Sequence, residues 1–189
     1  MTEYLSEIEE AERAIEEGNI DDARKILAPL VDKNVAAAIR INSSFFESGM
    51  SEEEMDRIYV EGMFKAAELG DKKALYRVGV FYDLGECGVR VDKRRATEIF
   101  KELAEEGDAH CMWIYACERI WGRGSFPIAT DQGLKLLDLA IELGSAEACI
   151  TKADFYDKGE FGLDVDIEKR DELRKLAMQY DDTTYDSYA

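Results

Sequence analysis

Hydrophobic residues recur along the chain at the spacing of an amphipathic helix. The first stripe lies within residues 2–17 and consists of Tyr4, Ile8, Ala11 and Ile15. Such steps of three and four residues place the side chains on one face of a helix. A second apolar stripe follows the Gly18-Asn19 stop and contains Pro29, which we expect to bend the helix or end it early. Residues 1–33 therefore predict an N-terminal helix pair.

From about residue 34 the pattern repeats every 37 residues without a gap. Small residues recur at one position of each first helix, namely Ala37, Ala74, Cys111 and Ala148. Large apolar residues recur in the second helix, namely Met63, Phe100 and Leu137. One helix pair cannot bury its own apolar face, whereas stacked pairs can. The pattern predicts an all-α fold of stacked antiparallel helix pairs. Its four repeats are expected at about 34–70, 71–107, 108–144 and 145–180.

Each junction between repeats carries the same stop and start signal. Gly70, Gly107 and Gly144 are followed by Asp71, Asp108 and Ser145, respectively. Glycine adopts the left-handed conformation that ends a helix, and an Asp or Ser side-chain oxygen accepts from the free N–H groups of the next one. We therefore expect each glycine to end a second helix and each Asp or Ser to cap a first helix.

The last repeat departs from the others in its second helix. Arg170 and Arg174 stand where earlier repeats have small or apolar residues. Because no further repeat has to pack there, these arginines predict a polar terminal cap. Residues 181–189 are polar and predict a frayed C-terminal tail.

Residues 78–96 carry a motif that resembles the Sel1-like repeat. They read Val78-Gly79-x-x-Tyr82-x-x-Gly85, then Gly88-Val89-x-x-Asp92-x-x-Arg95-Ala96. The resemblance implies a right-handed α-α superhelix (solenoid) related to tetratricopeptide arrays, and protein–protein binding, often as an adaptor. The 37-residue period favours this family over tetratricopeptide repeats, whose period is about 34. The corner after Gly122 departs from the motif, because Ala129 holds the Asp position and the Gly-Val pair is missing.

The charge balance narrows the choice of partner. The chain has 42 acidic and 24 basic residues, a net charge of −18. Such a surface repels nucleic acid. It either serves solubility alone or steers a basic partner, and both interpretations stay open. No apolar run approaches the roughly 18 residues of a membrane helix, and the acidic N-terminus lacks a signal-peptide pattern. We expect a cytoplasmic protein that binds neither membranes nor nucleic acid.

Residues able to carry chemistry are sparse. Cys87, Cys111, Cys117 and Cys149 form no Cys-x-x-Cys motif, and we interpret them as free thiols that pack mostly as small apolar groups. His110 is the only histidine, and a solvent-exposed helix position is favoured over a general base. The glycine corners at 85–88 and 159–162 lack the Gly-Lys-Ser/Thr of a phosphate loop. We expect no enzyme, no cofactor and no metal site.

Aromatic residues and arginines on the first helices are the candidate partner-binding residues. They are Arg40, Tyr76, Arg77, Trp113 and Trp121. Tyr76 and Trp113 hold equivalent repeat positions, together with Ile39 and Ile150. The aromatic side chains belong either to the core between repeats or to an exposed stripe in the groove. The two arginines, also equivalent, either receive a partner's carboxylates or form ordinary surface ion pairs.

Two functions fit this sequence. The first is a non-enzymatic adaptor or scaffold that binds another protein in the concave groove of the repeat array. The alternative is an acidic antagonist, such as an immunity protein that binds and inhibits a basic toxin or enzyme. The charge, the small size and the lack of a catalytic set suit both functions.

Overall fold

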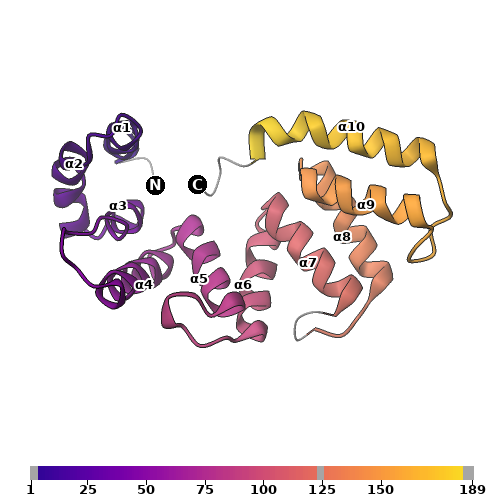
Figure 1. The fold of residues 1–189 in the computed structure, drawn as a ribbon, viewed down its shortest axis with the longest axis horizontal. Coiled ribbons are helices and arrows are strands. Elements are labelled where there is room, and N and C mark those ends of the chain that lie inside the picture. Colours follow the sequence, from indigo (N-terminus) through magenta and orange to yellow (C-terminus); the bar gives the residue numbers. More distant parts are fainter. Residues whose placement is uncertain (1–3, 123–125, 185–189) are drawn as a thin grey trace. The chain divides into compact units, whose positions relative to one another are not determined.

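The computed structural model describes residues 4–122 and 126–184, and all regular structure within these ranges is helical. Two compact units divide the chain between Asp92 and Lys93. The first unit contains α1 (Leu5–Glu16), α2 (Ile20–Asp32), α3 (Ala36–Asn42), α4 (Glu52–Glu68), α5 (Lys72–Leu84) and the short 3₁₀ helix η1 (Glu86–Gly88). The second contains α6 (Lys93–Glu105), α7 (Ala109–Trp121), α8 (Thr130–Glu142), α9 (Ala146–Lys158) and α10 (Ile167–Thr184) (Figure 1). The predicted all-α class is confirmed.

Within each unit, consecutive helices pack against each other. In the first unit, a core cluster joins α1, α2 and α3 through Ile8, Ala11, Leu27, Leu30, Ala38 and Ile41. Further along this unit, the buried Phe81 ring lies edge-on to Tyr59, with 5.7 Å between the ring centroids. In the second unit, a cluster joins α7, α8 and α9 through Ala116, Ile120, Leu137, Ala140, Ala148 and Phe155. Apolar contact between successive helices thus holds each unit together.

The predicted capping signals are confirmed at all three junctions. Asp71 Oδ1 accepts from the Ala74 N–H at 2.7 Å, and the equivalent Asp108 Oδ1 accepts from Cys111 at 2.7 Å. Ser145 Oγ accepts from the Ala148 N–H at 3.1 Å. The preceding glycines all have positive φ, at +91°, +93° and +95°. In each of these repeats, the side chain of the capping Asp or Ser therefore fixes the residue at which the first helix starts.

The corner inside each of the last three repeats contains the same main-chain hydrogen bond. The bonds run from Asp92 N to Tyr82 O, from Ala129 N to Arg119 O and from Asp166 N to Tyr156 O, at 2.8, 2.8 and 3.0 Å. Because this bond uses backbone atoms alone, Ala129 makes it as the aspartates do. Ala129 lacks the side-chain cap that Asp166 Oδ1 gives to the Lys169 N–H. Residues 123–125 of the divergent corner lie outside the described ranges.

The structure adds detail to the sequence-based expectation at three places in the helices. Pro29 does not end α2, which continues to Asp32. Because Pro29 lies in the last turn of the helix, its missing N–H group removes one backbone hydrogen bond there and leaves the earlier turns intact. Arg170 and Arg174 reach back to α9, where they pair with Asp157 and Asp154 at 2.7 and 3.2 Å. Residues 181–184, placed in the tail by the sequence, belong to α10. The tail residues 185–189 lie outside the described ranges.

Each corner also contains a branched side chain that lies against the glycine ending the first helix. A Cβ on Gly85 would lie 2.8 Å from Val91 Cγ2, and a Cβ on Gly122 would lie 2.6 Å from Ile128 Cγ1. Gly85 has φ of +75°. Glycine is therefore required at this position for two reasons, its backbone conformation and the space that it leaves for the branched side chain.

We predict that Gly85→Ala lowers the free energy of unfolding more than Gly70→Ala does. Both positions have positive φ, but a Cβ on Gly70 would meet nothing within 4 Å. The expected costs are about 1 kcal/mol for Gly70→Ala and about 2–4 kcal/mol for Gly85→Ala, because the second adds a clash. Urea unfolding of both variants measures the difference. Equal costs would contradict the role given to Val91.

Candidate protein-binding surface

One face of α9 is turned away from the core of the second unit. It consists of Glu147, Ile150, Thr151, Asp154 and Lys158, which follow each other at helical spacing. Next to this face lie the buried residues Ala146, Cys149 and Ala153. Ile150 is 43% exposed although it is a large apolar residue. This helix thus presents an apolar side chain, flanked by polar ones, to its surroundings.

α7 extends this face through two hydrogen bonds to α9, one of which joins equivalent repeat positions. His110 Nδ1 lies 2.9 Å from Glu147 Oε1, and Trp113 Nε1 donates to Thr151 Oγ1 at 2.9 Å. The first pair is 37 residues apart, which is the repeat period, whereas Thr151 lies one residue beyond Ile150, the position equivalent to Trp113. His110, Trp113, Glu147, Ile150 and Thr151 together define what we call the Trp113 surface.

Packing and hydrogen bonding fix the orientation of the Trp113 ring. The ring is half-buried and packs against the core cluster of the second unit. Its N–H group is bonded to Thr151, and the His110 ring lies 5.3 Å away, centroid to centroid. A tryptophan held in this way offers a large contact area at a small cost in conformational entropy.

The carboxylate of Glu147 is the charged group of this surface. It accepts hydrogen bonds from His110 at 2.9 Å and from Ser145 Oγ at 3.0 Å. The bond from His110 lowers the pKa of Glu147 to about 2, although partial burial opposes the shift. Because a carboxylate only accepts, His110 Nδ1 carries the shared proton. The expectation of a solvent-exposed His110 is wrong, since its side chain is only 29% exposed and is held by Glu147.

Trp121 lies on the core side of α7. Its ring meets Phe155 and Phe161 edge-on, with centroid separations of 5.5 and 5.9 Å. It packs against the same core cluster as Trp113, but its aromatic neighbours come from α9 and from the corner that follows α9. These contacts give Trp121 a packing role in the second unit.

The two candidate arginines of the first unit already have intramolecular partners. Arg40 pairs with Asp71 at 3.2 Å and with Glu12 at 3.5 Å, and its side chain is only 16% exposed. Arg77 pairs with Glu86 at 2.6 Å, and its guanidinium lies 5.0 Å from the Phe81 ring centroid. These contacts correspond to the ion-pair interpretation of both side chains. Tyr76, the remaining candidate, is half-buried on α5.

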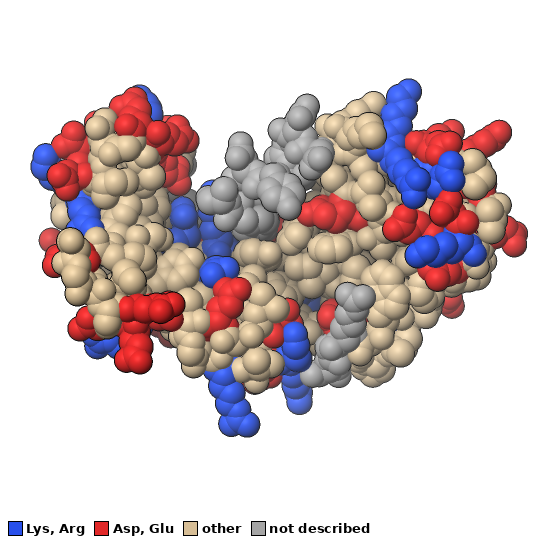
Figure 2. Space-filling view, in the orientation of Figure 1, with Lys and Arg blue, Asp and Glu red and all other residues tan. Residues whose placement is uncertain are grey.

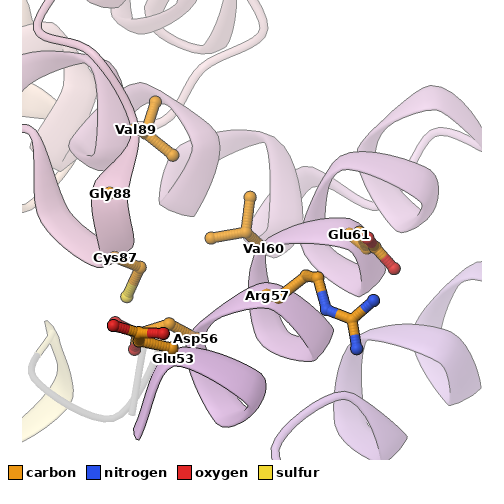
Figure 3. A pocket seen from close by; sticks show the side chains of 8 residues that line it. All are labelled: Glu53, Asp56, Arg57, Val60, Glu61, Cys87, Gly88 and Val89. Carbon is orange, nitrogen blue, oxygen red and sulfur yellow. The ribbon is translucent and has the colours of Figure 1, made fainter.

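A shallow pocket of about 410 Å³ lies between α4 and the η1 corner of the first unit (Figure 3). Its lining consists of Glu53, Asp56, Arg57, Val60, Glu61, Cys87, Gly88 and Val89. Figure 3 shows the Cys87 thiol directed toward Asp56, with the Arg57 guanidinium directed away from both. Burial and the hydrogen bond to Asp56 raise the pKa of Cys87, which keeps it a neutral thiol. Sequence reasoning missed this pocket because its two walls lie about thirty residues apart.

Neither the pocket nor the Trp113 surface offers a metal site. Among the residues described, no three His, Cys, Asp or Glu side chains are grouped so that they could hold a metal ion. Cys111, Cys117 and Cys149 are buried, as expected of small apolar groups. None of the described helices has the length and apolar composition needed to cross a bilayer.

Acidic side chains cover much of the visible surface. Figure 2 shows them gathered over α1, α2 and α4 in the first unit, and mixed with basic side chains over α10 in the second (Figure 2). Several basic side chains are held in ion pairs, for example Lys152 with Asp138. The surface therefore presents an excess of carboxylates to solvent.

We predict a pH-dependent contribution of Glu147 to stability. Because its folded pKa is lowered from 4.5 to about 2, the contribution is present above about pH 4.5 and is lost as the pH falls toward 2. Urea midpoints of the wild type and of Glu147→Gln should differ at neutral pH and converge in acid. Glu142→Gln, an exposed change on α8, serves as the control. A difference that persists at low pH would contradict this account.

No protein-family model matches the sequence, and a search of curated protein sequences gives no match. Solved structures do resemble the chain. One is a Sel1 repeat protein from Oxalobacter formigenes, 22% identical, with a TM-score of 0.75 over 93% of this chain and 72% of that one. Another is c5321, a protective antigen of uropathogenic Escherichia coli strains that displays an SLR fold. It is 19% identical, with a TM-score of 0.65 over 83% of this chain. The chain spans about a third of c5321. The chain has the Sel1-like repeat fold.

Proposed function

We propose that this chain is a non-enzymatic protein-binding module, an adaptor or scaffold that binds its partner through the Trp113 surface. The observation that carries the proposal is the orientation of Trp113, which Thr151 and the core fix while part of the ring stays accessible. Tryptophan is among the residues that most often dominate binding energy at protein interfaces. The exposed Ile150 on the neighbouring helix extends the apolar contact.

The geometry of Ser145, Glu147 and His110 supports a binding role rather than a hydrolytic one. These residue types also occur in catalytic triads, where the hydroxyl is hydrogen-bonded to the histidine. Here Ser145 Oγ donates to Glu147, accepts from the Ala148 N–H and is buried. Its oxygen is neither activated by His110 nor accessible to a substrate. The serine caps a helix, and the histidine positions a carboxylate.

A second candidate function is an acidic antagonist of a basic toxin or enzyme. The ion pairs that the basic side chains form within the chain favour it. Arg40, Arg77, Lys152, Arg170 and Arg174 all pair with carboxylates of the same chain. The chain has 42 acidic and 24 basic residues, so carboxylates outnumber the cations of the same chain that could pair with them. Such a surface attracts a basic protein and accelerates its association. Four free thiols suit either function in the cytoplasm.

We predict that Trp113→Ala weakens partner binding by about 30-fold, because a central tryptophan at an interface contributes roughly 2 kcal/mol or more. Tagged wild-type and variant proteins are used for pull-downs from the native lysate, with mass spectrometry to identify what is lost. Leu139→Ala, which removes another exposed apolar side chain of the second unit, is the matched control. Circular dichroism verifies folding. Partner loss with the control but not with Trp113→Ala would refute the assignment of this surface.

The antagonist function makes a separate prediction about ionic strength. Once a partner is isolated, its association rate constant should fall about ten-fold between low and moderately high salt if charge steers the encounter. Stopped-flow fluorescence of the tryptophans measures this rate. A rate constant independent of salt would favour an adaptor that relies on apolar contact.

A further inference from the structure

We propose that the Trp113 surface binds a cationic side chain of the partner, an arginine or lysine, over the indole ring with its charge facing Glu147. An apolar residue beside that cation would lie on Ile150. This inference rests on the proposed function and specifies the chemistry of the partner. It gives the partner segment a definite composition, a basic residue flanked by an apolar one.

Trp113 can contact a partner through its ring but not through its N–H group. Its only hydrogen-bond donor is already bonded to Thr151 at 2.9 Å. What remains for binding is the part of the π system that the core and the His110 ring, 5.3 Å away between centroids, leave exposed. Its negative face attracts cations within about 6 Å of the ring centre. Tryptophan is the strongest cation–π acceptor among the side chains, and arginine is its most frequent cation.

The Glu147 carboxylate can accept a further hydrogen bond. A carboxylate has about four acceptor sites on its two oxygens. Of the side-chain donors around it, His110 binds Oε1 and Ser145 binds Oε2. The Glu147 side chain remains 31% exposed, so a guanidinium or ammonium group can still reach it. The same two bonds hold the carboxylate in place, which reduces the entropy lost on binding.

Lys152 and Arg174, two basic side chains that pair with residues near the Trp113 surface, do not pair with Glu147. Lys152 follows Thr151 on α9, but it pairs with Asp138 of α8. Arg174 of α10 pairs with Asp154, one turn beyond Ile150. Both cations are thus engaged with carboxylates other than Glu147. The overall charge of −18 further favours a cation as the incoming group.

The test is a titration of the ¹⁵N-labelled full chain with two blocked tetrapeptides, Leu-Arg-Leu-Ala and Leu-citrulline-Leu-Ala. Citrulline keeps the shape of arginine without its charge. The chain has two tryptophans, so the spectrum contains two indole N–H signals. We expect the arginine peptide to shift the Trp113 signal and leave in place that of Trp121, whose ring packs against Phe155 and Phe161. It should bind about five-fold more tightly than the citrulline peptide, from one cation–π contact and one exposed ion pair.

Two charge-matched variants separate a local effect from a general one. Glu147→Gln should reduce the preference for the arginine peptide to about two-fold, which leaves the cation–π contribution. Glu142→Gln, which removes the same charge from an exposed site on α8, should leave the preference unchanged. An equal loss in both variants would show that only net charge matters, which overturns the proposal.

The remaining outcomes are also decisive. Equal binding of both peptides at the Trp113 signal would overturn the cation site while supporting an apolar binding surface. A shift of the Val60 and Val89 amide signals with none at Trp113 would assign the cation to the first-unit pocket instead, against this proposal. If neither peptide moves the Trp113 signal at millimolar concentration, both the cation site and the proposed binding surface fail.

Discussion

The structure depends on the side-chain cap at the start of each first helix. Asp71, Asp108 and Ser145 each accept from the N–H group three residues ahead. This bond sets the residue at which the helix begins, and thereby the direction in which every later side chain of that helix points. A first helix that started one residue later would turn its side chains by about 100°. The arrangement of the Trp113 surface therefore depends on capping as much as on its own residues.

In the second unit, two capped helices in the same register place equivalent positions next to each other. His110 meets the equivalent Glu147, and Trp113 meets Thr151, the neighbour of its equivalent Ile150, because α7 and α9 begin at equivalent residues. The buried faces of the two helices carry small residues, which bring the backbones close together. The polar side chains of the Trp113 surface lie away from these buried faces, whereas Trp113 itself packs against the core cluster and stays partly exposed. A repeat array can thus build a continuous surface from single residues that lie far apart in the sequence.

Much of this architecture follows from the sequence because it rests on local signals with fixed spacing. The glycine stops and the caps at Asp71, Asp108 and Ser145 needed no knowledge of tertiary contacts. The partners of long side chains did not follow in the same way. Arg40 and Arg77 hold equivalent positions, yet one pairs with a helix cap and the other with a corner residue. Periodicity identifies the face of a helix, whereas the choice of an ion-pair partner depends on rotamers and on neighbours from other helices.

The measurement that tests the central claim most directly is amide hydrogen–deuterium exchange of the chain with and without its isolated partner. We predict that bound partner slows amide exchange in α7 and α9, around Trp113 and Ile150, and leaves amide exchange in α8 unchanged. Protection confined to α8, or to α4 and the first-unit pocket, would contradict it.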